Sequence, residues 1–192
     1  MVFMYVGRFA PSPTGLLHMG SLVAALASFL DARAAGGRWL VRIEDLDAPR
    51  NVPGAADGIL RQLVAHGLVW DGPVLWQSTR QAAYRAALAR LQQQDLVYGC
   101  ACSRQAIAQH SHARTVDGSP RYPGTCRAGL PPGQTARAWR AKVPDRQIVF
   151  IDDWQGKQTQ DLGREVGDFV VWRADDLPAY QLAGVVDDAF SG

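Results

Sequence analysis

The sequence predicts an α/β fold built on a parallel sheet. An apolar strand candidate, Val2 to Val6, leads through a proline- and glycine-rich crossing into an alanine-rich helix candidate that begins at Gly20. A second apolar strand candidate, Trp39 to Ile43, follows that helix. Strand, helix and strand in this order form a βαβ unit, in which the two strands are parallel and the crossover is right-handed.

Apolar residues at helical spacing predict three helices in the first part of the chain. The first runs from Gly20 to the pair Gly36-Gly37, and the second from about Pro53 to His66. The third begins at Ser78, where Ser78 and Gln81 match the S-x-x-Q capping box. The residues expected to face the core are Leu22, Leu26, Phe29 and Leu30 in the first helix, Ile59, Leu60, Leu63 and Val64 in the second, and Tyr84, Leu88 and Leu91 in the third.

Beyond Tyr98 the composition of the sequence changes. Residues 100–135 are rich in Cys, Ser, Gly, Pro and Arg and show little periodicity, which is typical of an insertion without a large core of its own. The segments that read as strands after it are Ala136 to Val143, Gln147 to Ile151 and Phe169 to Trp172. We expect Ala179 to Phe190 to return the chain to the parallel sheet.

Composition sets broad limits. The chain has 192 residues, of which 47% are hydrophobic, enough for one domain that carries an insertion. No run of eighteen or more residues is apolar, and the first residues lack the basic-then-apolar pattern of a secretory signal, so we expect no membrane segment. Its three cysteines, two of them one residue apart, argue against a disulfide framework and favour a reducing cytoplasm. A net charge of +2 is too small to indicate nucleic acid by itself.

The crossing from Gly7 to Ser21 is the most informative segment. Its prolines and glycines exclude continuous secondary structure, so it must turn tightly from a strand end to a helix start. Backbone N–H groups at a helix N-terminus attract anions. His18 adds an imidazole donor there, and Gly20 permits close approach of a ligand. The pattern indicates phosphate chemistry, although an isolated His-x-Gly is more often a plain strand–turn–helix connection.

The same run resembles the R-F-A-P-S-P-T-G…H-x-G-x signature of class I glutamyl-type aminoacyl-tRNA synthetases. His18-Met19-Gly20-Ser21 stands in the place of the "HIGH" motif, and the resemblance extends from Arg8 to the last residues. It implies a Rossmann-like class I aminoacyl-tRNA synthetase catalytic core with a zinc-bearing insertion. It also implies that ATP binds with Mg²⁺ held mainly by its phosphates. The catalytic residues would be His18, Gly20 and Ser21.

The resemblance implies a glutamate pocket as well. Glu44, Asp45 and Asp47 follow a strand's carboxyl end, where ligands bind in parallel sheets, but by position alone a solvated acidic turn that caps the next helix is the commoner arrangement. The family's matching acid binds the α-amino group of glutamate, which points to Glu44. Tyr180 matches the tyrosine that closes over glutamate, although alone it reads as a core aromatic. The rest of the implied pocket is Arg8, Phe9, Ala10, Pro11 and Ser12, with arginine the natural partner of a carboxylate.

Three cysteines in the irregular segment are candidate metal ligands. Cys100 and Cys102 have C-x-C spacing, and Cys126 ends the segment Tyr122-Pro-Gly-Thr-Cys. A structural Zn²⁺ site normally has four ligands, and a bound metal would stabilise a small irregular subdomain. Buried cysteines that bind no metal explain the spacing equally well. Chemistry alone suggests a histidine as the fourth ligand, either His110 or His112. The family's Cys-x-Cys…Tyr-x-x-x-Cys pattern instead implies Tyr122.

Other segments narrow the resemblance to the glutamyl-Q subgroup. Members activate glutamate with ATP and transfer it to the queuosine base at the wobble position of tRNA(Asp), without an anticodon-binding domain. The implied partners are ATP, L-glutamate and the tRNA(Asp) anticodon loop, and we expect a monomer. The narrowing segments are Ser21 to Leu26, Arg42 to Asp47 and Val52 to Ala56. We expect the first half of the catalytic domain over residues 1–98, the insertion over 99–166 and the start of the second half over 167–192.

The chain departs from the family pattern in two ways. It has two lysines, Lys142 and Lys157, and neither lies in a segment like K-M-S-K-S. The family arginine expected shortly after Tyr180 would lie beyond Gly192. We therefore expect the chain to be C-terminally incomplete, the N-terminal part of a longer enzyme, and slow or inactive by itself.

Three other functions fit parts of the sequence. A fragment of an ordinary glutamyl-tRNA synthetase shares most of the motifs. A small-molecule adenylyltransferase uses a similar histidine motif at a helix start, but needs no zinc insertion. A non-catalytic, zinc-stapled RNA-binding module would account for the insertion without the signature.

Overall fold

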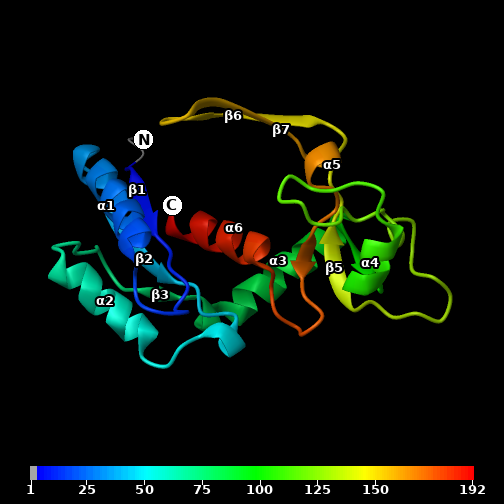
Figure 1. Cartoon of the computed structure of the whole chain (residues 1–192), viewed down its shortest axis with the longest axis horizontal. Coiled ribbons are helices and arrows are strands. Elements are labelled where there is room, and N and C mark those ends of the chain that lie inside the picture. The colour runs from blue at the N-terminus through cyan, green and yellow to red at the C-terminus, as the bar shows by residue number, and fades with distance from the viewer. Residues whose placement is uncertain (1–3) are drawn as a thin grey trace. The chain divides into compact units, whose positions relative to one another are not determined.

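The computed structural model describes residues 4–192. They group into two compact units, Met1–Ala83 with Val185–Gly192, and Tyr84–Gly184. Figure 1 labels the elements of both. In residues 4–192 there is no helix of the length and apolarity needed to span a bilayer.

The first unit contains the predicted βαβ arrangement. Its three strands are β1 (Val6–Phe9), β2 (Arg38–Ile43) and β3 (Leu75–Trp76), paired in parallel in the order β1-β2-β3. The helical elements of this unit are α1 (Met19–Ala34), η1 (Ala48–Arg50), α2 (Ala55–Ala65) and η2 (Gln77–Arg80). The α/β fold class predicted from the sequence is confirmed.

The first strand differs from its prediction. It begins at Val6, where the predicted strand was to end, and continues through Gly7 and Arg8 to Phe9, paired with residues 38–41 of β2. Residues 2 and 3 of the predicted strand lie outside the described residues. Because proline cannot donate to a ladder, the strand ends just before Pro11.

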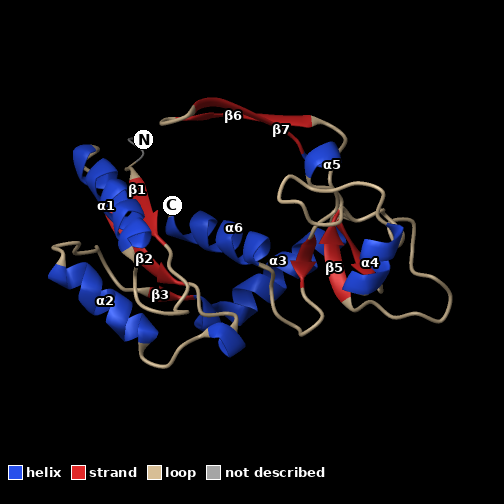
Figure 2. Cartoon of the chain, in the orientation of Figure 1, coloured by secondary structure: helices blue, strands red, loops and turns tan. Residues whose placement is uncertain are grey.

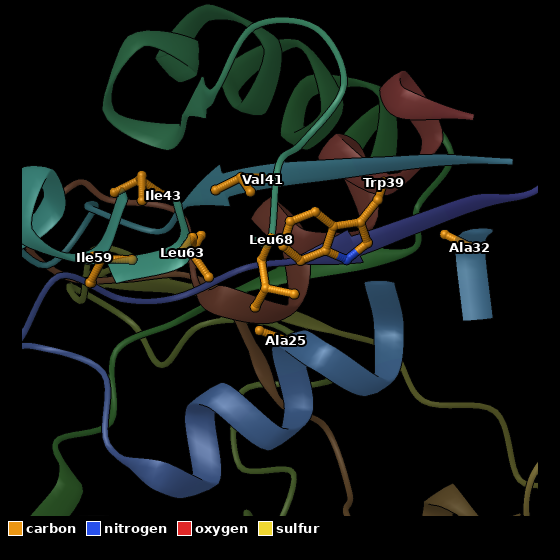
Figure 3. Packing of buried hydrophobic residues seen from close by; sticks show 8 residues of the cluster. All are labelled: Ala25, Ala32, Trp39, Val41, Ile43, Ile59, Leu63 and Leu68. Carbon is orange, nitrogen blue, oxygen red and sulfur yellow. The ribbon is translucent and has the colours of Figure 1, made fainter. Parts of the chain in front are cut away.

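The core of the first unit lies against one face of β2, whose alternate residues Trp39, Val41 and Ile43 are buried. Figure 3 shows these side chains packed with Ala25 and Ala32 of α1 and with apolar residues of α2. The indole of Trp39 stacks on Phe9 and meets Phe29 edge-on, with ring centroids 6.4 and 5.2 Å apart.

The predicted core face of α1 is wrong in part. Leu26 and Leu30 are exposed, and the fully buried residues of this helix are Ala25 and Ala32. The helix presents small residues because it lies close to β1. A Cβ on Gly7 would stand 2.9 Å from Ala32 Cβ and 3.0 Å from Ser28 O.

The other two predicted helices are present with corrected details. In α2, Ile59 and Leu63 are buried as predicted, but Val64 is exposed because it lies at the edge of the apolar stripe. The predicted capping box is wrong, because Ser78 lies in η2 and the helix α3 (Gln81–Gln93) begins only at Gln81. The Ser78 hydroxyl instead donates to Asp45 Oδ2 at 2.6 Å.

The second unit contains an antiparallel sheet and a separate hairpin. The sheet has the order β4-β5-β8, and the hairpin β6-β7 forms a long two-stranded ribbon (Figure 1). Between α4 and β5 the chain is almost all loop, as predicted for residues 100–135 (Figure 2). The elements are β4 (Val97–Cys100), α4 (Arg104–His110), β5 (Ala138–Ala141), β6 (Gln147–Asp152), β7 (Gly156–Asp161), α5 (Leu162–Glu165), β8 (Val170–Trp172) and α6 (Tyr180–Ser191). The strands β4 and β7 and the short helices α4 and α5 were not predicted from the sequence.

A buried carboxylate joins the segments of the second unit. Asp168 accepts hydrogen bonds from Tyr98 Oη at 2.7 Å, Arg127 Nη1 at 2.8 Å and the Val143 backbone N–H at 2.8 Å. Its side chain is 4% exposed. A buried carboxylate is tolerated only when it is paired and hydrogen-bonded in this way.

Helix α6 makes the predicted return toward the parallel sheet. Its C-terminal residues group with the first unit, where the buried Asp187 accepts hydrogen bonds from Gln77 Nε2 at 2.8 Å and Arg80 Nε at 2.6 Å. The guanidinium of Arg80 also lies 4.0 Å from the ring centroid of Phe190. These contacts anchor the end of the helix beside η2.

The close contact of β1 and α1 yields a prediction about stability. We expect Gly7→Ala to lower the free energy of unfolding by about 1–3 kcal/mol, the usual cost of overpacking. The added methyl would press on the backbone oxygen of Ser28, which has little freedom to move. Urea unfolding measures the change.

Gly184→Ala is the matched control, because a Cβ at Gly184 in α6 meets no atom within 4 Å. Helix propensity then predicts unchanged or slightly higher stability. Equal stability of the Gly7 and Gly184 variants would contradict the packing argument.

Candidate functional site

The crossing from β1 to α1 is held by backbone contacts. The Glu44 N–H donates to Pro11 O at 3.0 Å, and the Val52 N–H donates to Pro13 O at 2.9 Å. These bonds place the crossing directly beside the carboxyl end of β2. Ala10 and Ser12 belong to this stretch, and Ser12 O accepts from the Thr14 N–H at 2.9 Å.

Helix α2 supports the second half of the crossing. The side chain of Gln62 accepts from the Leu17 N–H at 2.8 Å and donates to Leu17 O at 3.3 Å. Gly58 makes room for Leu16, because a Cβ at that glycine would collide with the leucine side chain. The sequence analysis did not identify Gln62 or Gly58, because their spacing does not distinguish them from other residues of α2.

His18 is the N-cap of α1. Its backbone is extended, its Nδ1 accepts from the Ser21 N–H at 3.3 Å, and its Nε2 lies 3.1 Å from Ser21 Oγ. A Cβ on Gly20 would come within 3.2 Å of the imidazole, so the ring lies over the glycine. The first turn of α1 carries no acidic side chain. The three predicted catalytic residues therefore meet at one exposed helix N-terminus, where the helix dipole favours an anion.

Glu44 follows β2 directly and is largely buried, with its side chain 8% exposed. Arg42 donates to its Oε1 from Nη2 at 3.0 Å, and also donates to Asp188 Oδ1 from Nη1 at 2.6 Å. Burial raises the pKa of Glu44, while the adjacent Arg42 opposes that shift only in part. Glu44 is thus a fixed carboxylate rather than a solvated one, which removes the acidic-turn alternative.

Arg8 lies on the face of the sheet opposite the apolar core. Its Nη2 donates to Asp188 O at 3.3 Å, and its buried Nε has no hydrogen-bond partner within the described residues. A cavity of about 340 Å³ opens on this face. Besides Arg8 it is lined by Arg38, Arg42 and Arg80, of which Arg42 is paired with Asp188 and Arg80 with Asp187.

Two other predicted pocket residues have different surroundings. The ring of Phe9 packs against the core of the first unit, so this side chain supports the sheet. Tyr180 is the first residue of α6 and is 68% exposed, in the second unit. Its exposure removes the alternative that it is a core aromatic.

The three cysteines converge. Their sulfur atoms lie within 4.8 Å of one another, and Cys102 Sγ is 3.7 Å from Cys126 Sγ. A disulfide would need about 2.05 Å, so the thiols are free. Tetrahedral zinc with Zn–S bonds of about 2.3 Å would separate sulfur atoms by roughly 3.8 Å. The cluster therefore has the dimensions of a zinc site.

The fourth position beside the thiols is occupied by a phenol. Tyr122 Oη lies 3.4 Å from Cys100 Sγ and 3.7 Å from Cys102 Sγ, and accepts from the Cys126 N–H at 2.9 Å. Neither histidine joins the cluster within the described residues, and the ring of His110 is 2.8 Å from Ala106 O. This geometry favours Tyr122 over a histidine.

The thiols differ in acidity. Burial works to raise the pKa of Cys100, but the hydrogen bond with Tyr122 and the nearby Arg140 outweigh it, and the net shift is downward. Burial and the neighbouring thiols raise the pKa of Cys102. Burial also raises the pKa of Tyr122. Of these two thiols, Cys100 is therefore the more readily deprotonated.

The parallel βαβ unit, the crossing with an imidazole at a helix N-terminus and the thiol cluster define a class of protein. The chain belongs to the class I tRNA synthetases (E and Q): residues 5–192 match the model of their catalytic domain. It is 63% identical over 188 residues to the glutamyl-Q tRNA(Asp) synthetase of Dechloromonas aromatica (strain RCB), covering 98% of this chain and 62% of that protein. It is 64% identical over 187 residues to the glutamyl-Q tRNA(Asp) synthetase of Thiobacillus denitrificans, covering 97% and 62%.

Solved structures give the same fold. A glutamate tRNA ligase from Elizabethkingia meningosepticum, in complex with its amino acid, matches with a TM-score of 0.80 and 28% identity, over 96% of this chain and 41% of that one. The glutamate-tRNA synthetase of Elizabethkingia anophelis matches with a TM-score of 0.81 and 27% identity, over 97% and 42%. The chain spans about three fifths of the length of the two glutamyl-Q tRNA(Asp) synthetases.

Proposed function

We propose that the chain takes part in the ATP-dependent activation of glutamate and its transfer to the queuosine base in the anticodon loop of tRNA(Asp). The observation that carries this proposal is the joining of the signature crossing to the end of β2. It places the His18 helix terminus and the buried Glu44 on elements that share backbone hydrogen bonds. The relatives from Dechloromonas and Thiobacillus are named for this function.

In the proposed first step, a glutamate carboxylate oxygen attacks the α-phosphorus of ATP. A P–O bond forms to the carboxylate, the bond to the leaving pyrophosphate breaks, and glutamyl-adenylate results. His18, Gly20 and Ser21 at the N-terminus of α1 stabilise charge on the phosphates, with no covalent enzyme intermediate. Mg²⁺, held mainly by the phosphates of ATP, would neutralise part of their charge. The modified base of the tRNA then attacks the activated carbonyl and releases AMP.

The glutamate pocket is proposed on the sheet. Glu44 binds the substrate ammonium, and Arg8 offers its guanidinium to a carboxylate from a face already lined with arginines. The crossing residues Ala10, Pro11 and Ser12 line the pocket beside Glu44. Phe9 packs against the core and so holds these residues in place. Tyr180 closes over the bound amino acid. The functional division into residues 1–98, 99–166 and 167–192 is part of the same proposal.

We also propose a structural Zn²⁺ held by Cys100, Cys102, Tyr122 and Cys126. The sulfur separations and the position of the Tyr122 oxygen support this ligand set. When bound, zinc would staple the loop-rich segment, which has few apolar residues of its own. Protein purified without added zinc should contain close to one equivalent by elemental analysis, and a metal-free protein of equal stability would contradict the proposal.

Variants identify the zinc ligands. Cys102→Ala should lose the metal and loosen residues 100–135 to hydrogen exchange, while the parallel sheet stays protected. Tyr122→Phe should lower zinc affinity, whereas His110→Ala and His112→Ala should leave it unchanged. Loss of zinc in either histidine variant would assign that histidine as the fourth ligand.

Glu44 is the sharpest test of the amino-acid site. In the product of the complete gene, Glu44→Ala should lower glutamate-dependent ATP–pyrophosphate exchange by tenfold or more at low glutamate, because a charge-assisted hydrogen bond contributes about 1.5–3 kcal/mol. The ionised carboxylate is the form that binds the ammonium. Because burial raises the pKa of Glu44, the KM for glutamate should rise on acidification at a higher pH than an ordinary carboxyl would give.

The control is Asp47→Asn in the same turn, where the carboxylate pairs with the exposed Arg50 at 2.6 Å. It should leave exchange kinetics unchanged. If Glu44→Ala behaves like this control, Glu44 does not bind the substrate.

The acceptor test uses ATP, labelled glutamate and tRNA(Asp) with or without queuosine. Transfer by the product of the complete gene should require the modified base and survive periodate treatment of the terminal ribose. Single-stranded loops with splayed bases are the usual targets of specific RNA recognition. Charging of tRNA(Glu) that periodate abolishes would instead establish ordinary glutamyl-tRNA synthesis.

A further inference from the structure

A buried arginine beside the thiol cluster has no carboxylate partner. Arg140 lies in the middle of β5, paired with Tyr98 of β4 and Val170 of β8, and is 8% exposed. Its Nη1 donates to the backbone O of Asp168 at 2.9 Å. Within the described residues it forms no ion pair, and its buried Nε has no hydrogen-bond partner. A buried cation in this state is costly unless an anion is brought to it.

Arg140 lies against the aromatic residue of the thiol cluster. The Arg140 guanidinium lies over the ring of Tyr122, with its carbon 3.9 Å from the ring centroid. A cation in this position is attracted to the aromatic face and restricts the ring's orientation. The phenol oxygen of the same ring is the atom that lies between the sulfurs of Cys100 and Cys102.

Charge balance explains the arrangement. Three thiolates around a divalent cation carry at least one net negative charge, and two of the three cysteines are buried. An uncompensated negative centre in such surroundings is as costly as an uncompensated cation. Once the metal is bound, the positive charge of Arg140 and the negative charge of the cluster therefore offset each other's cost of burial.

We propose that Arg140 is a positioning and charge-compensating residue of the metal centre: it offsets the negative charge of the loaded cluster and holds Tyr122 in the ligating orientation. This inference rests on the zinc site proposed above. It separates two states of the protein. In the loaded state Arg140 is stabilising, whereas in the metal-free state it is an unpaired buried charge.

The test compares Arg140→Gln and Arg140→Lys in the 192-residue chain, loaded with Zn²⁺ or stripped of metal. Competition with a chromophoric chelator should show zinc affinity lowered about 10–100-fold in Arg140→Gln, the usual effect of losing an outer-sphere partner. Arg140→Lys keeps the charge without the planar group and should fall between. With Co²⁺ as the probe, the d–d absorption should shift in Arg140→Gln because Tyr122 is no longer held.

Thermal unfolding decides between this role and a merely structural one. Removing the guanidinium should lower the melting temperature of the zinc-loaded chain and leave that of the metal-free chain unchanged or higher. A structural arginine would instead lower both, and that result would overturn the inference. The matched control is Arg137→Gln, which removes the same charge from an exposed position just before β5 and should change neither affinity nor melting.

Two further results would be decisive. Zinc affinity and a Co²⁺ spectrum unchanged in Arg140→Gln would overturn the role of Arg140 while leaving the zinc site intact. A parent chain that binds no stoichiometric Zn²⁺ would overturn the zinc site itself, and the role of Arg140 with it. If Arg140→Gln does not fold, the affinity and the two melting temperatures of Arg140→Lys decide in the same way.

Discussion

The candidate site depends on how closely α1 approaches β1. Gly7 has no side chain, Ala32 has a single methyl, and the backbone of Ser28 lies against the strand. The Ser28 hydroxyl also accepts a hydrogen bond from Trp39 Nε1 at 2.9 Å, which ties the helix to the next strand. Because α1 contacts both strands, the position of its N-terminus relative to the sheet is fixed. The imidazole of His18 is presented at the end of a rigid helix rather than on a free loop.

The charged side chains of the site are held from a distant part of the sequence. Asp187 and Asp188 are adjacent in α6 yet serve different partners: the first binds Gln77 and Arg80, and the second binds Arg42. Arg42 in turn holds Glu44. A carboxylate more than 140 positions away in the chain therefore fixes the orientation of the arginine beside the proposed substrate acid. Such preorganisation means that binding does not have to order these long side chains.

The sequence was sufficient for features that depend on local chemistry. The prolines and glycines of the crossing, the C-x-C spacing and the apolar stripe of α2 all correspond to observed structure. The predictions failed where tertiary contacts decide the outcome. In α1 alanines are buried in place of the predicted leucines, because the sheet lies too close for larger residues. The Ser78 hydroxyl donates to Asp45 instead of capping α3. The Asp188–Arg42 pair had no local signal at all.

The two units achieve stability in different ways. The first buries a continuous apolar cluster around Trp39, and burial of apolar surface is the main driving force of folding. The second buries apolar residues such as Val97, Val171 and Trp172, together with a polar network: Asp168 with three donors, and the free thiols with Tyr122. A buried polar network stabilises only when its members are satisfied, and in this one the Nε of Arg140 has no hydrogen-bond partner within the described residues. The Zn²⁺ proposed above would therefore couple folding of the second unit to metal binding, while the parallel sheet that carries the proposed chemistry contributes none of the three cysteines.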